Sequence, residues 1–438
     1  MIFLPLVVFI LAYGCFIFSD KSKPWVACGA GVLLLALYAA GALAPARAET
    51  SAVLFFLTHV IRWNMLGLML GMMVISKIFE DSRIPAVLAE GLVKRCRDTR
   101  SALFWVAMLT GFFSIFLCNA SCVLLIAPVA LSLTRKLNVN PVRPLICLAI
   151  VSNLQGTATL IGDPPSMLLA GHMKLGFNDF FFYHGKPSIF WAIQAGALAS
   201  AGVVWFVLRR GNQRIEAIEP ERARSWFPAW VITLLVAVLA CASSFDRHFS
   251  WLAGTAALAF AVVAGVWFLR ARWGTLNDLL RSVDWQTLFF LVGMFVMVQA
   301  LSDAGWLQRM ADGIAVVSKG NVFAAFCTVV GVSVVVSAVV DNMPFLVAMI
   351  PVAERVAQRF ATDGSAGNVP LFMFGLLAGA CLGGNITPIG ASANIVAMGI
   401  LRREGHTVLF GSFMRIGVPF TIAAVLAGCG LIWLVWGG

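Results

Sequence analysis

Two aspartates lie inside apolar stretches of this 438-residue chain. Asp163 follows the run Thr-Ala-Thr-Leu-Ile-Gly (157–162), and Asp341 lies within Val-Val-Asp-Asn-Met-Pro-Phe (339–345). Ionisable groups are costly inside a membrane, and they mark ion or proton pathways by default. We therefore expect both aspartates to carry protons, and Asp341 is the better candidate because it lies at a turn. Asp163 precedes two prolines, which also suits a helix cap.

Small polar residues accompany these aspartates twice, at a constant offset. Gly-Thr-Ala-Thr-Leu-Ile-Gly (156–162) is matched by Gly-Asn-Ile-Thr-Pro-Ile-Gly (384–390), because 390 − 162 = 228. Glycine and proline break apolar helices, and the freed N–H groups suit oxyanions while the freed carbonyls suit cations. The candidate binding residues of the two breaks are Asn153, Gly156, Thr157, Thr159 and Gly162 in the first, and Gly384, Asn385, Thr387, Gly390, Ser392 and Asn394 in the second.

A second pair of polar interruptions lies upstream of each break. The segments 101–134 and 321–352 are apolar at both ends and polar in the middle, with Asn119 falling on Asn342 (342 − 119 = 223). We interpret both as re-entrant hairpins whose tips are buried in protein. For 101–134, two short full spans are the alternative. Cys118 takes the place of Asp341 at the first tip, so Cys118, Asn119, Asp341 and Asn342 complete the candidate site.

The composition predicts the elements that must position these residues. Hydrophobic residues make up 61% and charged residues 12% of the chain, far from the balance of a soluble domain. We predict an all-α polytopic membrane protein with about 10 to 11 spans plus the two hairpins, given about 20 apolar residues for each span. The clear spans are 2–19, 25–44, 52–78, 188–208, 227–243, 251–269, 285–302 and 413–436, and the interrupted segments 145–171 and 370–400 hold the broken helices.

The net charge of +11 reflects how the chain threads the membrane. Arginine and lysine cluster in short loops, which the positive-inside rule assigns to the cytoplasm. Counting crossings from these loops places the two hairpins on opposite sides, so the two halves are inverted repeats. We expect a first repeat over 1–208, a cytoplasmic linker over 209–226 and a second repeat over 227–438. No interleaving of basic and aromatic residues suggests a nucleic-acid partner.

Three runs carry a resemblance to a known family: 157–165, 339–345 and 380–394. From about residue 64 onward the chain resembles the ion transporter superfamily, in its branch of arsenite permeases, NhaD-type sodium–proton antiporters and the melanosomal P protein. The resemblance implies inverted repeats, a scaffold with a mobile transport domain, alternating access of elevator type and a homodimer. Two departures are Leu-Cys-Asn (117–119) for the common Leu-Asp-Asn, and Ser166 for Asn after Asp-Pro-Pro.

Three transport functions compete on these residues. The first, which we favour at this point, is proton-coupled efflux of arsenite and antimonite, since arsenite is neutral at pH 7 and thiols such as Cys118 bind it. The second is sodium–proton antiport at Asp341, and the third is transport of small carboxylates or other anions by the freed helix N-termini. Absence of Arg and Lys from the four motif segments weakens the third.

Other classes of protein fit less well. The five histidines are dispersed and no CxxC pair occurs, so we expect neither an enzyme nor a metal site or cofactor beyond a gradient of H⁺ or Na⁺. A channel would also use re-entrant segments, but its flux would neither saturate nor counter-exchange. We expect a multi-pass inner (plasma) membrane protein whose partners are a small inorganic substrate or ion, lipid and a second copy. The sequence leaves a separate ATPase subunit open.

Overall fold

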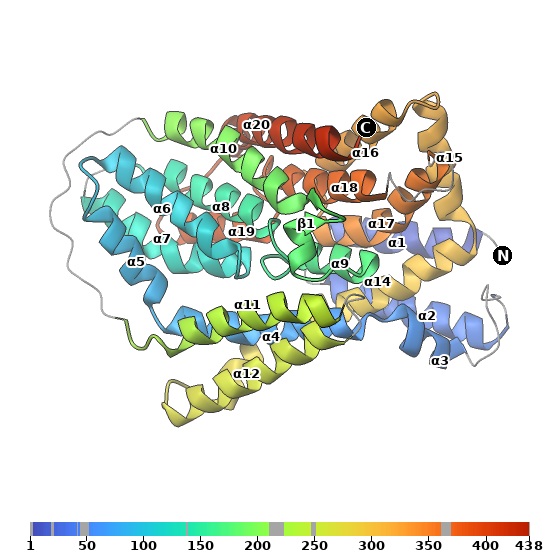
Figure 1. Ribbon diagram of the computed structural model, residues 1–438, viewed down its shortest axis with the longest axis horizontal. Helices are drawn as coiled ribbons and strands as arrows, with labels where there is room; N and C mark the ends of the chain where they lie inside the picture. Colours follow the sequence, from blue (N-terminus) through green and yellow to red (C-terminus); the bar gives the residue numbers. More distant parts are fainter. Residues whose placement is uncertain are drawn as a thin grey trace.

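Helices make up nearly all of the regular structure. The computed structural model describes residues 3–18, 22–41, 43, 52–136, 139–209, 223–246, 251–360 and 369–437. Within these ranges the strands are β1 (Phe182–Tyr183) and β2 (Lys186–Pro187), a two-residue antiparallel pair. Because lipid offers no partner to backbone polar groups, helices that satisfy their own are the expected solution. The predicted all-α polytopic class is confirmed (Figure 1).

Five helices among the described residues are long and apolar enough to span a membrane alone. They are α4 (Trp63–Asp81), α10 (Ile189–Val207), α12 (Leu252–Arg270), α14 (Trp285–Asp303) and α20 (Phe410–Trp436). Other helices connect and flank them: α1 (Phe3–Phe18), α2 (Lys23–Ala39), α3 (Ala52–Phe55), η2 (Phe56–Val60), α5 (Ile84–Val93), η3 (Asn178–Phe180), α11 (Phe227–Phe245), α13 (Leu276–Ser282) and α15 (Trp306–Val317).

The predicted hairpins are two helix pairs. In the first, α6 (Thr99–Ser114) and α7 (Asn119–Lys136) flank the tip, and in the second, α16 (Val322–Ser337) and α17 (Asn342–Arg359) do so. Figure 1 shows α6 and α7 toward one end of the molecule and α16 and α17 toward the other. The hairpins therefore enter from opposite ends, as the inverted-repeat prediction requires.

The two predicted broken helices are also present. The first consists of α8 (Val142–Gly156) and α9 (Pro164–Met173), and the second of α18 (Val369–Gly383) and α19 (Ser392–Arg403). The first break follows Gly156 and the second follows Gly383, so each gap falls on a repeated glycine motif. Pro164 and Pro165 open α9, where a missing N–H costs little.

Two predictions about the N-terminal region need correction. The expected span 52–78 is interrupted, because Ile61 is extended and separates η2 from α4. The Trp63 indole donates a 2.6 Å hydrogen bond to the Leu57 carbonyl across this break. Lys23, which lies between the expected spans 2–19 and 25–44, is not in a loop: it begins α2 and contacts the tip of the second hairpin.

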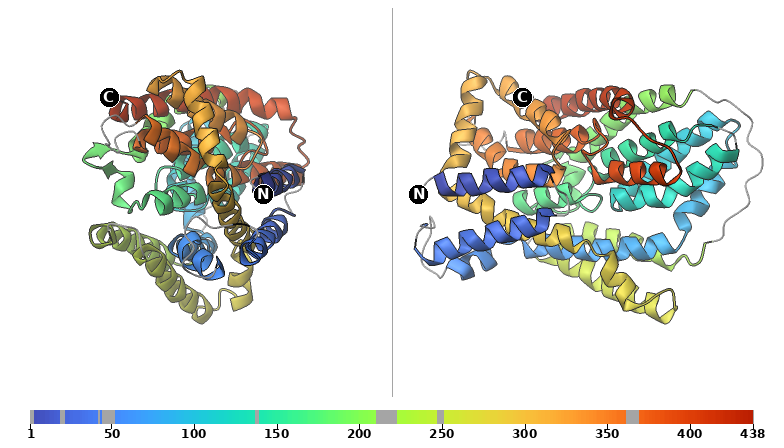
Figure 2. Two further views of the ribbon diagram at one scale, coloured as in Figure 1. Left: turned by 90° about the vertical axis from the view of Figure 1, so that its right-hand side faces the viewer. Right: turned by 180° about the vertical axis from the view of Figure 1, so that it is seen from behind.

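The two halves of the chain interlock. Helix α2 of the first half packs along α14 of the second, and α12 of the second packs along α4 of the first. Small residues let these backbones approach closely: a Cβ at Gly71 would lie 2.6 Å from the Ala257 carbonyl. Figure 2 shows α12 projecting at the edge of the molecule, while α4 also packs on α9 and α14 on α17. The repeat boundaries stay a prediction, and 210–222 of the linker lie outside the described residues.

Candidate functional site

Both hairpin tips and both helix breaks meet at one cavity of ≈ 430 Å³. The helices α7, α9, α17 and α19 all begin at its wall, because Ala120, Pro164, Asn342 and Ser392 line it. The N-terminus of a helix carries about half a positive charge and unpaired N–H groups. Four such ends therefore surround a space large enough for a small molecule.

Amide side chains hold the first tip against the first break. The Ser114 hydroxyl donates to Oδ1 of Asn119 at 2.7 Å, and Nδ2 of Asn119 donates to Oδ1 of Asn153 at 3.3 Å. Nδ2 of Asn153 then donates to Oδ1 of Asn385 at 2.9 Å. Asn153 thus links the first tip to the second break, across the two repeats.

The second tip repeats this arrangement. The Ser337 hydroxyl donates to Oδ1 of Asn342 at 2.8 Å, matching Ser114 and Asn119. Thr159 and Thr387 also correspond, since each hydroxyl donates to a carbonyl at the adjacent tip, Ile115 and Ala338 respectively. The repeated motif is therefore repeated in its hydrogen bonds.

The second break holds two unpaired polar atoms. Nδ2 of Asn394 donates to the carbonyls of Gly384 and Thr387, at 2.9 Å each. Its buried Oδ1 and the buried Nδ2 of Asn385 find no hydrogen-bond partner among the described residues. A free acceptor and a free donor at one break could serve a cation and an anion.

The glycine spacing that the two halves share has a steric cause at Gly156. A Cβ there would overlap Oδ1 of Asn119, which docks against it. At Gly384 a Cβ would lie 2.7 Å from the Gly390 carbonyl, so the two ends of the second break also meet backbone to backbone. Small residues here allow tip and break to close on each other.

The two aspartates differ in environment. Asp163 is 6% exposed and precedes α9, but its side chain makes no capping hydrogen bond. The Asp341 side chain is 45% exposed and caps α17 through the N–H of Met343 at 3.4 Å. Its Oδ2 also lies 3.7 Å from Nζ of Lys23, while the Tyr13 hydroxyl donates to the nearby Pro344 carbonyl. The tip carboxylate therefore has an ammonium partner from the N-terminal helices.

The cavity wall combines predicted and unpredicted residues. Of the predicted candidates, the wall includes Cys118, Asn153, Asp163, Asp341, Asn342 and Ser392. The others hold the tips and breaks behind it: Asn119, Gly156, Thr157, Thr159, Gly162, Gly384, Asn385, Thr387, Gly390 and Asn394. Cys122 is fully buried, with Sγ 3.9 Å from the Leu117 carbonyl, so only the Cys118 thiol of this pair meets the cavity.

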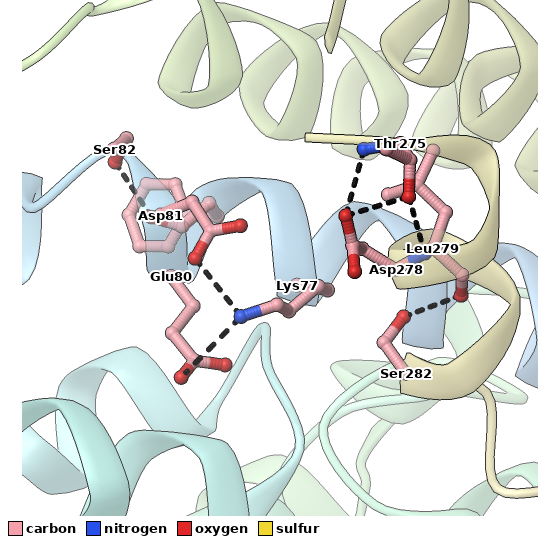
Figure 3. Close-up of polar contacts among 9 residues, drawn as sticks. Lys77, Glu80, Asp81, Ser82, Thr275, Asp278, Leu279 and Ser282 are labelled. Atoms are coloured by element: carbon pink, nitrogen blue, oxygen red, sulfur yellow. Dashed lines mark hydrogen bonds and ion pairs between the residues drawn. The ribbon is translucent and has the colours of Figure 1, made fainter. Parts of the chain in front are cut away.

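Sequence reasoning missed the charged side of the cavity. Lys77, Glu80 and Asp284 line it, and Nζ of Lys77 lies 2.9 Å from Asp81 and 3.9 Å from Glu80. Figure 3 shows Lys77 directed at both carboxylates, with Ser282 and Asp278 of α13 on the facing side. The sequence signal that could have revealed this side is Lys77 itself, a charged residue one position before the end of the expected span 52–78.

The chain is similar to several transporters. The profile of the family described as Citrate transporter (CitMHS) matches residues 13–369. An uncharacterized transporter of Mycobacterium tuberculosis is 31% identical over 416 residues, 92% of this chain and 93% of that protein. The P protein of Homo sapiens is 27% identical over 464 residues, covering 85% of this chain and 54% of that protein. The solved structure of the YdaH transporter of Alcanivorax borkumensis matches with a TM-score of 0.62 at 14% identity, covering 94% of this chain and 98% of that one.

Proposed function

The chain belongs to the citrate transporter family of secondary transporters, and on this premise we propose that it carries small carboxylate anions together with a cation or proton. The supporting observation is the convergence of four helix N-termini on one cavity. Helix N-termini favour anions through their dipoles and free N–H groups. A small di- or tricarboxylate could be held by several of them at once.

The carboxylates of the site explain why a cation would travel with the anion. Asp163 and Asp341 both line the cavity, and when ionised they would repel the anionic substrate. A proton or Na⁺ at either aspartate reduces that repulsion, and a site near neutrality crosses a low-dielectric barrier at lower cost. The unpaired Oδ1 of Asn394 and the carbonyls of the second break suit a cation such as Na⁺.

The sequence argument against a carboxylate carrier was the absence of basic residues from the four motif segments, and this argument is weaker in the folded protein. The four motif segments lack Arg and Lys, but Lys77 lines the cavity from α4 and Lys23 reaches Asp341 from α2. Within the described part of the chain, the cavity wall therefore has one basic side chain, Lys77, whose ammonium is shared with Glu80 and Asp81.

Arsenite efflux, the function that the sequence favoured, becomes the second candidate. Cys118 favours it, because its thiol lines the cavity and thiols bind trivalent arsenic. Against it, a neutral substrate would gain little from the partial positive charges of four converging helix N-termini.

For either substrate we expect alternating access in which the hairpins and broken helices move as one body against the interlocked pairs α2–α14 and α4–α12.

Counterflow in vesicles tests the proposal. Purified protein in proteoliposomes loaded with citrate or succinate should exchange labelled substrate, saturably, and proton or Na⁺ movement should accompany net uptake. Arsenite and antimonite are run in parallel at equal concentration. Exchange of arsenite without exchange of any carboxylate would reject the proposal in favour of the second candidate, and proton–Na⁺ exchange indifferent to both would favour sodium–proton antiport.

A further inference from the structure

A second polar cavity of ≈ 350 Å³ lies at the opposite ends of two helices that line the first. Helix α9 reaches the central cavity at Pro164 and the second cavity at His172. Helix α17 lines the central cavity at Asn342 and Met343 and the second cavity from Val347 to Gln358. Arg355 follows Asn342 by 13 residues, which corresponds to about 20 Å along a helix. The remaining wall comes from η2, the start of α4 and the end of α14.

The carboxylates in and behind the wall of this cavity already have partners. Oε2 of Glu354 lies 2.9 Å from Nε2 of His172, which joins α17 to α9. Behind the wall, the Asp303 carboxylate accepts from the Tyr38 hydroxyl at 2.7 Å and from Nε2 of Gln299 at 2.9 Å. Each carboxylate therefore has donors of its own.

Guanidinium donors of the same cavity are left over. Nη2 of Arg355 donates to the Ser302 hydroxyl at 2.8 Å, but its buried Nη1 has no hydrogen-bond partner among the described residues. Arg62 also lines the cavity, half-buried and in the electrostatic field of Glu354. A buried guanidinium N–H without an acceptor costs stability, so a ligand that accepts hydrogen bonds would be stabilising here.

We propose that this cavity is a second anion site, at which Arg355 and Arg62 bind a small carboxylate. Guanidinium groups suit this ligand because their planar N–H pairs match the two oxygens of a carboxylate. The substrate class rests on the proposed function, but the site does not, since its donors are independent of the central cavity. An anion held here would wait at the far ends of α9 and α17, on the route to or from the hairpin tips.

Citrate binding to the full-length protein in lipid nanodiscs, measured by calorimetry, tests the second site. The test variant is Arg355→Gln, and the matched control is Arg359→Gln, one turn further along α17, whose exposed guanidinium pairs with Asp312. Both arginines lie near the C-terminal end of α17, so a dipole effect alone would affect both variants. Arg355→Lys keeps the positive charge that Arg355→Gln removes, so it shows how much of the binding depends on charge. Thermal unfolding of each variant checks that the fold is retained.

Two binding events are expected in the wild type, with one weakened at least about tenfold by Arg355→Gln and partly restored by Arg355→Lys. Arg359→Gln should keep both. Binding that is unchanged in Arg355→Gln, or altered equally by both glutamine variants, would overturn the second site, as would a wild type that binds no citrate.

A central-site variant separates this inference from the proposed function. Ser392→Asp puts a carboxylate at the start of α19, where the side chain is exposed to the central cavity, and should remove the other binding event. Citrate bound only in an Arg355-dependent way, with no counterflow, would reject the proposed function and keep the second site. If counterflow occurs and all citrate binding is sensitive to Ser392→Asp and none to Arg355→Gln, the second site is rejected and the proposed function is kept.

Discussion

Lys23 and Asp341 form the contact at which coupling is most easily examined. Lys23 begins α2, while Asp341 caps α17, so the pair joins the N-terminal helices to the second hairpin tip. The corresponding first tip carries Cys118, which cannot form such a pair. An ammonium beside a cation-binding carboxylate competes with the cation that would bind there.

We predict that Lys23→Gln lets the coupling cation bind Asp341 more tightly. Because the Asp341 side chain is 45% exposed, the effect should be modest, about a 1.5- to 5-fold fall in the cation concentration that half-saturates uptake. Uptake into proteoliposomes at varied pH and Na⁺ measures it. Lys94→Gln, at an exposed lysine that follows α5, is the control and should behave as wild type. A half-saturation unchanged in both variants would assign the Lys23 contact to packing alone.

Cys118 gives a second prediction at the level of one residue. A small charged methanethiosulfonate reagent should attach to Cys118, fill part of the cavity and stop citrate counterflow, and saturating citrate should slow the reaction. Cys118→Ser should keep counterflow within about twofold, since serine is the smaller isostere, and abolish the inhibition. Cys122→Ser, at the fully buried neighbour, should leave the inhibition intact. Loss of transport in Cys118→Ser together with arsenite exchange would favour the second candidate instead.

At the scale of elements, the hairpin tips must dock on the helix breaks. Gly156→Ala places a methyl group against the Asn119 amide, which already bonds Ser114 and Asn153. The tip would have to move and leave buried amides unpaired, at about 1–3 kcal/mol for each lost partner. We predict lowered thermal stability and at least a tenfold fall in counterflow.

Gly399→Ala is the matched control for that substitution. A Cβ at Gly399 meets nothing within 4 Å, and the residue lies within α19. Alanine should there be neutral or stabilising by about 0.5–1 kcal/mol. Equal losses in both variants would mean that the tip contact at Gly156 carries no special weight.

The elements that the sequence predicted are those encoded by local chemistry. Both hairpins and both broken helices were predictable, because Gly, Pro and Asn interrupt apolar helices by their own conformational preferences. The break before Arg62 was not, since neither Gly nor Pro lies at it and only the extended backbone of Ile61 marks it. Lys23 and Lys77 could not be assigned to the site either, because α2 and α4 reach it through packing between the two halves.

On the scale of the whole molecule, two polar cavities lie at different depths along the same helices. The central cavity extends along α4 to Glu80 and along α7 to Leu124, toward the ends where basic loops gather. The α7 and α19 ends lie together there, joined by the ion pair of Arg135 and Glu404. The second cavity lies at the other ends, around Gln358. The lining of the central cavity thus extends toward the side that the positive-inside rule assigns to the cytoplasm.

This arrangement predicts the sidedness of labelling. In a Cys118→Ser background, Ser392→Cys should react with a membrane-impermeant thiol reagent from the cytoplasmic side, and Gln358→Cys from the opposite side, since both positions are exposed. Inside-out and right-side-out vesicles, with the labelled peptide identified by mass spectrometry, measure labelling from the two sides.

If the hairpins and broken helices move as one body during transport, adding citrate should expose Ser392→Cys to the opposite side as well. Labelling from both sides without substrate would indicate an open channel, and labelling from one side only under active counterflow would contradict alternating access at this cavity.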